Sequence, residues 1–140
     1  MDFADYFLLR KKTYQMETLK HAELTRIIIG CAMKIHRAMG PGYPEVIYLR
    51  CLVIELTNAG LKCKTEVGKD IFYEGINVGS RRMDLLVEDL VIVETKAISE
   101  LEPKEYNQVL NYLKVFNFEV SLLLNFGNTS LQYKRFVNTR

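Results

Sequence analysis

Apolar residues in the first part of the chain follow a helical period. From Glu17 onward, the residues that recur at spacings of three and four are Leu24, Ile27, Ile28, Cys31 and Ile35. This spacing places side chains on one face of a helix, and Gly40-Pro41-Gly42 then breaks the pattern. Pro44 suits the first turn of a second helix. We expect that helix to end near Gly60, because glycine favours the position after a helix C-terminus.

After residue 60 the apolar pattern becomes that of strands. Cys63, Thr65 and Val67 alternate with charged residues, as in a half-buried strand. Further short strands are expected over 71–73, 76–79, 81–87, 90–97, 120–124 and 131–137, with a turn at Glu74-Gly75. Pro103 opens a third helix, whose apolar stripe is Val109, Leu110, Leu113 and Phe116. This order of elements predicts one α/β domain with a central mixed sheet flanked by helices.

Composition narrows the class of protein only slightly. A chain of 140 residues suits one domain, and 49% hydrophobic with 26% charged residues is ordinary for a globular protein. We expect an N-terminal extension over residues 1–16 and a single domain over residues 17–140. The net charge of +2 neither announces nor excludes a nucleic-acid partner, because a local basic patch is sufficient to hold phosphates.

Cysteine usage and the N-terminus bear on location. Cys31, Cys51 and Cys63 are odd in number and show no CxxC or Cys/His spacing, which indicates buried free thiols in a reducing cytosol. Acidic residues near the N-terminus do not resemble a signal peptide. No apolar run approaches the roughly 18 residues that span a bilayer. We therefore expect a cytoplasmic protein without membrane association.

Three charged residues lie inside otherwise apolar predicted strands. Asp84 is one, and Glu94 and Lys96 share a face of the next strand because side chains alternate. Burying an unpaired carboxylate is costly, so these groups must face solvent, pair with each other or hold a cation. The register of the hairpin decides whether Asp84 lies beside Glu94 and Lys96. A two-residue loop at Glu88-Asp89 sets Asp84 opposite Val93, whereas a three-residue loop sets it opposite Glu94.

We expect the three-residue connection, centred on Asp89, because it brings the two carboxylates together. Asp84 and Glu94 would then hold Mg²⁺ or Mn²⁺, hard cations that take oxygen ligands. Lys96 would steady an attacking water or the charge that develops on phosphorus. The alternative is a Glu94–Lys96 ion pair on an exposed strand, with Asp84 unrelated, since this spacing is common by chance.

Several motifs occur together in a fixed order. Gly42-Tyr43-Pro44-Glu45-Val46-Ile47-Tyr48 has glycine, glutamate and tyrosine spaced as G-x-x-E-x-x-Y. It is followed by Arg82-Met83-Asp84-Leu85-Leu86-Val87, Val93-Glu94-Thr95-Lys96-Ala97, Gln108-Val109-Leu110-Asn111-Tyr112-Leu113 and Leu124-Asn125-Phe126-Gly127. In this combination the chain, from about Glu23 to Val137, resembles the GxxExxY protein family. That family is placed within the PD-(D/E)XK nuclease superfamily.

The resemblance implies a restriction-endonuclease-like (PD-(D/E)XK) fold and a metal-dependent phosphodiesterase site. It makes Asp84 and Glu94 metal ligands and Lys96 the catalytic lysine. Glu45 matches an accessory acid that completes the metal shell, and Gln108 matches a polar residue that borders the active site. Tyr112 lies one helical turn further on the same face. Arg81, Arg82 and Tyr112 are candidate contacts to nucleic acid.

Other interpretations of individual residues stay open at this point. Glu45 can also be explained as a first-turn acid favoured by the helix dipole, and Tyr48 either orients Glu45 or belongs to the core. His36 suits capping or packing better than a phosphate contact, and Glu66 suits a solvated strand face better than a metal. Thr95 replaces an apolar residue usual in the family, and we expect it to pack away from the metal.

The sequence therefore predicts a metal-dependent nuclease acting on DNA rather than RNA. The alternative is a non-catalytic module of the same fold that binds nucleic acid or a protein partner, or forms a homodimer. The intact Glu94-x-Lys96 pair argues against the alternative.

Overall fold

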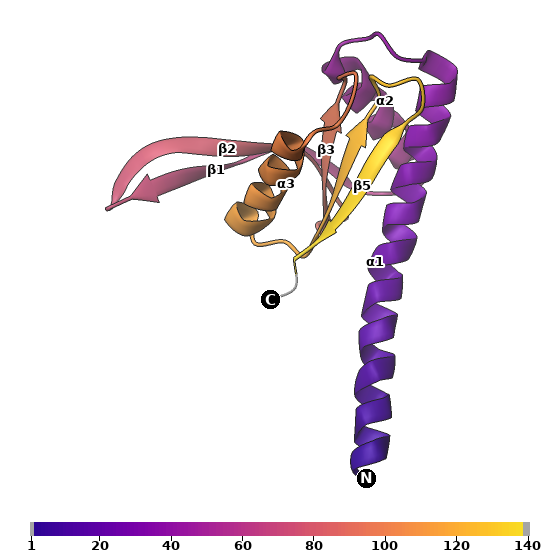
Figure 1. Ribbon diagram of the computed structural model, residues 1–140, viewed down its shortest axis with the longest axis vertical. Coiled ribbons are helices and arrows are strands. Elements are labelled where there is room, and N and C mark those ends of the chain that lie inside the picture. The colour runs from indigo at the N-terminus through magenta and orange to yellow at the C-terminus, as the bar shows by residue number, and fades with distance from the viewer. Residues whose placement is uncertain (1, 139–140) are drawn as a thin grey trace.

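The computed structural model describes residues 2–138, without the side chains of residues 10–20. Figure 1 shows one sheet with helices on both of its faces and two long projections, the outer part of the first helix and a two-stranded arm. In chain order the elements are α1 Phe3–Met39, α2 Glu45–Asn58, β1 Cys63–Tyr73, β2 Ile76–Val87, β3 Val91–Lys96, α3 Pro103–Phe116, β4 Val120–Asn125 and β5 Gln132–Val137.

The five strands form one mixed sheet in the order β1-β2-β3-β4-β5. Strands β3 and β4 are parallel and every other neighbouring pair is antiparallel. A parallel pair needs a crossover connection, and α3 lies in the connection between β3 and β4. The predicted α/β class and mixed sheet are confirmed.

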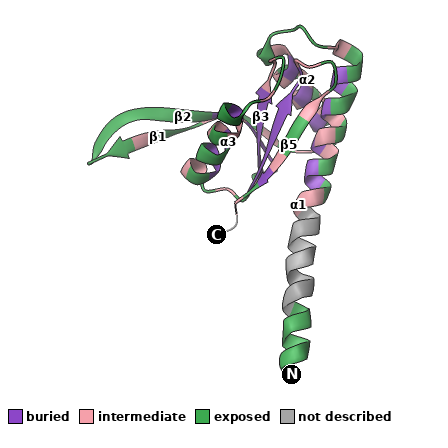
Figure 2. Cartoon of the chain, in the orientation of Figure 1, coloured by how far each residue is buried: buried purple, intermediate pink, exposed green. Residues whose placement is uncertain are grey.

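Each face of the sheet is covered by its own apolar cluster. One cluster packs α1 and α2 against residues such as Leu85 and Val93, and the other packs α3 against residues such as Met83 and Ile92. Figure 2 shows the buried residues concentrated in the central strands and in the helix faces that cover them. Leu110, expected in the apolar stripe of α3, is 49% exposed. The face of α3 that contacts the sheet is narrower than the row of apolar residues in the sequence, and Leu110 lies outside it.

The N-terminal helix begins earlier than the apolar period indicates. Helix α1 starts at Phe3 rather than at Glu17, and the side chain of its N-cap, Asp2, accepts a hydrogen bond from the Asp5 N–H at 2.8 Å. Its first half projects away from the sheet (Figure 1). Apolar periodicity marks only the part of a helix that packs on a core, which explains why the sequence pattern missed this segment.

Strands β1 and β2 continue beyond the sheet as a two-stranded arm. The separate short strands expected at 71–73 and 76–79 are the outer ends of β1 and β2, so those boundaries were wrong. The turn expected at Glu74-Gly75 is confirmed, and both residues have positive φ, 51° and 76°, as a two-residue hairpin loop requires. In Figure 1 the arm points away from the helices that cover the sheet.

Two further expectations concern the cysteines and the membrane. The cysteines at 31, 51 and 63 are free thiols of intermediate exposure, and burial raises the pKa of Cys31 and Cys63. Among the described residues, no helix is both long and apolar enough to cross a membrane.

Candidate functional site

The connection between β2 and β3 sets the register of the site. Val87 pairs with Val91 and Leu85 pairs with Val93, so three residues, Glu88-Asp89-Leu90, connect the strands. Glu88 and Asp89 adopt the left-handed conformation with φ of 54° and 55°. The predicted odd-length connection is therefore confirmed. Its consequence is that Asp84 lies opposite Glu94, and the Asp84 N–H donates to Glu94 Oε1 at 3.2 Å.

At Asp84 and Thr95, backbone N–H groups donate to carboxylate oxygens and not to the carbonyls of the neighbouring strand. Regular pairing of β2 with β3 covers residues 85–87 and 91–93. Beyond it, Glu94 Oε1 accepts from the Asp84 N–H, and Asp84 Oδ2 accepts from the Thr95 N–H at 3.0 Å. Side chains rather than carbonyls thus satisfy these backbone donors where β2 leaves the sheet. The two strands consequently hold the carboxylates at the point where they separate.

A local twist of the β1–β2 hairpin explains this geometry. In a regular strand Met83 and Leu85 would share a face, yet Met83 packs on the α3 side and Leu85 on the α1–α2 side. Their partners Val67 and Thr65 flank Glu66, whose φ is 57°. Both strands therefore rotate at this level, and Asp84 is placed at the rotation point. Glu66 is exposed, as expected for a solvated strand face.

Thr95 corrects one expectation. We predicted that it packs away from the carboxylates, because strand alternation turns it to the other face. It is fully buried, but its Oγ1 donates to Asp84 Oδ2 at 3.2 Å. The twist at Asp84 lets that carboxylate reach across the strand edge, which alternation alone does not allow. Thr95 is thus a positioning residue for Asp84.

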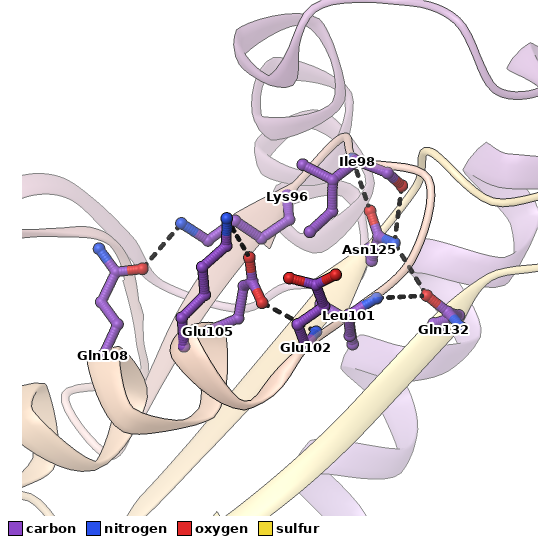
Figure 3. Close-up of polar contacts among 9 residues, drawn as sticks. Lys96, Ile98, Leu101, Glu102, Glu105, Gln108, Asn125 and Gln132 are labelled. Carbon is purple, nitrogen blue, oxygen red and sulfur yellow. Dashed lines mark hydrogen bonds and ion pairs between the residues drawn. The ribbon is translucent and has the colours of Figure 1, made fainter.

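Lys96 and Gln108 face one another across the space between β3 and α3 (Figure 3). The Lys96 ammonium donates to Gln108 Oε1 at 2.8 Å, and the Gln108 amide donates to the Tyr112 hydroxyl at 3.3 Å. Tyr112 is only 7% exposed. These bonds fix the direction in which the lysine points, and they bring together three residues that the sequence placed on two different elements.

Glu45 enters the site from the first turn of α2. Loss of solvent raises the pKa of Glu45, and the nearby Asp84 carboxylate raises it further, while the Lys96 ammonium lowers it. Since Asp84 and Lys96 act on the same carboxyl group, Glu45 belongs to this cluster and is not only a helix-dipole acid. Tyr48 is fully buried against Phe126, with ring centroids 4.6 Å apart, and its hydroxyl donates to the Gly40 carbonyl. It is therefore a core residue that holds the loop before Glu45.

The electrostatics of the site are dominated by Glu94. This side chain is 2% exposed, and burial, together with the adjacent Asp84 carboxylate, raises its pKa to about 9 against the lowering effect of Lys96. Burial also raises the pKa of Tyr112, and the charge of Glu94 adds to that effect. Excess negative charge in a partly dry site is the property that a bound cation would relieve.

The donor set fits a small hard cation better than a soft one. Among the described residues, no three His, Cys, Asp or Glu side chains stand as a ready metal cluster. Mg²⁺ does not require one, because it commonly binds through one or two carboxylates and keeps several waters. Asp84 and Glu94 supply two carboxylates that use Oδ2 and Oε1 for backbone bonds, and Glu45 stands nearby. The residues present therefore fit Mg²⁺ or Mn²⁺.

The two candidate arginines differ in position. Arg81 lines an open cleft of about 560 Å³ together with Lys96 and Gln108, and its Nε donates to Asn111 Oδ1 at 3.2 Å. Arg82 alternates to the opposite face of the arm, where its Nε lies close to Gly68. Only Arg81 is thus continuous with the site. His36 is buried and its Nε2 lies 2.9 Å from the Asn128 carbonyl, which agrees with the packing interpretation.

Asn125 lies in the motif Leu124-Asn125-Phe126-Gly127, and the sequence motifs predicted no role for it. It is fully buried at the end of β4, its Nδ2 donates to the Ile98 carbonyl and to Gln132 Oε1 (2.9 Å each), and its Oδ1 accepts from the Ile98 N–H at 3.0 Å. Gln132 Oε1 also accepts from the Leu101 N–H (Figure 3). The loop between Lys96 and α3 is held by these bonds. The sequence feature that could have indicated this role is a polar residue at the end of an otherwise mostly apolar strand.

Replacing Asn125 by alanine is expected to lower the free energy of unfolding by about 2 kcal/mol, because several buried donors and acceptors lose their partner at once. Thermal unfolding followed by circular dichroism measures the loss. Asn128→Ala is the matched control, since Asn128 donates a solvent-exposed hydrogen bond to the Ser99 carbonyl of the same loop. Equal, small effects of the two substitutions would contradict the role given to Asn125.

Comparison with known proteins agrees with the fold. The sheet, its helices and the two carboxylates with a lysine on adjacent strands define the class of restriction-endonuclease-like folds. The family model of the PD-(D/E)XK nuclease superfamily matches residues 22–136, and the chain belongs to that superfamily. The narrower resemblance to the GxxExxY family stays a prediction.

One solved structure is similar over part of its length. The crystal structure described as that of SSO0001 matches with a TM-score of 0.54 and 17% sequence identity, covering 68% of this chain and 50% of that one. The present chain therefore spans half the length of that protein, and the likeness supports the fold alone. A search of curated protein sequences finds no match.

Proposed function

We propose that this protein is a metal-dependent nuclease that hydrolyses phosphodiester bonds, with DNA rather than RNA as its substrate. The observation that carries the proposal is the convergence of Asp84, Glu94 and Lys96 on adjacent strands, with Glu45 beside them. Membership of a nuclease superfamily supports the same conclusion. A cytoplasmic location stays a prediction from the sequence.

Each residue has a defined task in this proposal. Asp84 and Glu94 would hold Mg²⁺ or Mn²⁺, with Glu45 as a third acid. The metal, when bound, supplies Lewis-acid activation of the phosphate and of a water. Lys96 stabilises the attacking water or the negative charge on the phosphate. Gln108 holds the Lys96 ammonium at 2.8 Å and so keeps it directed into the site.

The test is a cleavage assay on single-stranded and duplex DNA and on RNA, with Mg²⁺, Mn²⁺ or EDTA. Asp84→Ala and Lys96→Ala are each expected to lower metal-stimulated cleavage at least about 100-fold, because each removes a group that acts on the reacting atoms. Lys34→Ala, which changes a lysine ion-paired with Glu55 on the helical side, is the control. Cleavage that persists in both site variants would refute the mechanism.

The second candidate is a non-catalytic module of the same fold. The observation that favours it is the outer end of the arm, where four large apolar side chains are 61–71% exposed: Phe72, Tyr73, Ile76 and Val78. Exposed apolar groups of this kind are typical of contacts with a partner or a second copy. Calorimetry that detects no Mg²⁺ or Mn²⁺ binding, with nucleic-acid or protein binding retained, would favour this function over the first.

A further inference from the structure

An open cleft runs along α3 beside the proposed site. It has a volume of about 560 Å³. We name it the α3 cleft, and its lining residues are Arg81, Lys96, Lys104, Glu105, Asn107, Gln108 and Asn111. Lys96 and Gln108 belong to the site itself, so the cleft adjoins the site that contains Asp84 and Glu94.

The α3 cleft is positively charged. Its one lining carboxylate, Glu105, is 6% exposed and accepts a hydrogen bond from the Glu102 N–H at 2.8 Å, so it serves to cap α3. Lys104 lies 4.0 Å from that carboxylate, with its own side chain 78% exposed. Within the described part of the chain, Arg81 has no carboxylate in ion-pair range. The cleft lining therefore carries three cations and one carboxylate, and that carboxylate is already used to cap α3.

Lys69 extends this charge onto the arm. It pairs directly opposite Arg81 across the β1–β2 hairpin, and its ammonium donates to the Val115 carbonyl at the end of α3. Like charges placed directly opposite one another destabilise a hairpin. An anionic partner that contacts both side chains would turn this repulsion into an attraction, so the pair is consistent with an anion at this end of the cleft.

Side-chain amides line the cleft beside the cations. Asn107 and Asn111 lie one helical turn apart on α3 and both are exposed. From Lys104 to Asn111 the helix rises about 10 Å, which is about three nucleotides of a stacked strand at 3.4 Å each. Cations and amides spaced in this way are the groups that contact phosphate oxygens without reading base sequence.

We propose that the α3 cleft binds the sugar–phosphate backbone of the nucleic-acid strand, over about three nucleotides, and delivers it to Asp84, Glu94 and Lys96. The proposal rests on the proposed function, and it adds Lys69, Lys104, Asn107 and Asn111 to the substrate-binding surface. A nucleic acid suits the cleft better than an acidic peptide, because the cleft shares Lys96 and Gln108 with the proposed phosphodiesterase site. Recognition here is independent of base sequence.

The test measures binding without cleavage. Fluorescence anisotropy of a labelled 20-nucleotide single-stranded DNA is recorded in EDTA at several salt concentrations, with the full chain. Arg81→Gln and Lys104→Gln are each expected to weaken binding about 5-fold at low salt and to lower the salt slope by about 0.7, since each removes one phosphate contact. Asn107→Ala is expected to weaken binding about 2-fold with an unchanged slope. Lys34→Gln should bind as the wild type does.

The outcomes separate this proposal from the proposed function. Weakened binding in the cleft variants supports the α3 cleft even where no metal-dependent cleavage is found. Wild-type affinity in both Arg81→Gln and Lys104→Gln overturns it, as does an equal loss in Lys34→Gln, which would indicate a diffuse charge effect. Polyglutamate that displaces the DNA at equal charge concentration also overturns it, because a backbone-specific cleft discriminates between the two polymers.

Discussion

Glu94→Gln is expected to stabilise the metal-free protein at pH 8 while lowering metal-dependent cleavage about 1,000-fold, equivalent to about 4 kcal/mol. Gln keeps an Oε1 that can accept from the Asp84 N–H, so the strand contact survives. What it removes is a carboxyl group whose pKa burial and Asp84 raise to about 9. The Glu94 carboxylate therefore destabilises the metal-free protein, and the same carboxylate is proposed to bind the cation.

The sign of the stability effect follows from the pKa of Glu94. Between the ordinary value of 4.5 and the folded value of about 9, the native state keeps a proton that the unfolded state has released. The contribution of Glu94 is therefore fully present below pH 4.5 and is lost as the pH rises toward 9. Gln does not titrate, so the advantage of Glu94→Gln grows across that range, to on the order of 3 kcal/mol at pH 7.

Melting temperatures in EDTA at pH 5, 7 and 8.5 measure this difference. Glu119→Gln, at an exposed position, is the matched control and is expected to follow the wild type at each pH. Mg²⁺ should raise the melting temperature of the wild type and leave that of Glu94→Gln unchanged. A variant that is less stable than the wild type at every pH would contradict the burial argument.

Gly127→Ala is expected to lower the free energy of unfolding by about 3 kcal/mol or to prevent folding, because overpacking against backbone cannot be relieved by a side-chain rotation. A Cβ at position 127 would overlap the backbone nitrogen and carbonyl oxygen of Ile98 and lie 2.6 Å from the carbonyl carbon of Ala97. This is the loop that follows Lys96, so any adjustment would also displace the lysine. Soluble yield and thermal unfolding measure the effect.

The matched control for this substitution is Gly30→Ala. Gly30 lies inside α1, and a Cβ there would meet nothing within 4 Å. Alanine is the better helix former, so Gly30→Ala is expected to raise stability by about 0.8 kcal/mol. Opposite shifts from the same chemical change would show that close approach at Gly127 is the cause. A Gly127→Ala protein as stable as the wild type would contradict it.

Much of the site could be predicted from local sequence patterns. Periods of about 3.6 and 2 located the packed parts of the helices and strands, because burial of one face imposes them. The register argument at Glu88-Asp89-Leu90 depended only on strand alternation and loop length, and it correctly placed Asp84 opposite Glu94. Lys96 was placed on the face of Glu94 by strand alternation, and Gln108 was assigned to the site by the family resemblance.

Other features depend on contacts between segments far apart in the chain. The twist at Glu66 and Asp84, which turns Asp84 toward Thr95, arises where the arm leaves the sheet. The burial that raises the pKa of Glu94 requires the sheet and α3 to be in place. Local period carries no information on either feature, because the relevant neighbours come from other strands and helices.

The sequence by itself thus determined the class of fold, the identity of the charged residues and the register that pairs Asp84 with Glu94. These follow from short-range periodicity, turn length and motif order. Only the tertiary structure decided that Thr95 and Asn125 position the site, that Arg81 but not Arg82 lines the α3 cleft, and that α1 extends back to Phe3. Each of these features depends on how helices and strands that are distant in sequence lie relative to one another, and local sequence patterns contain no information on that arrangement.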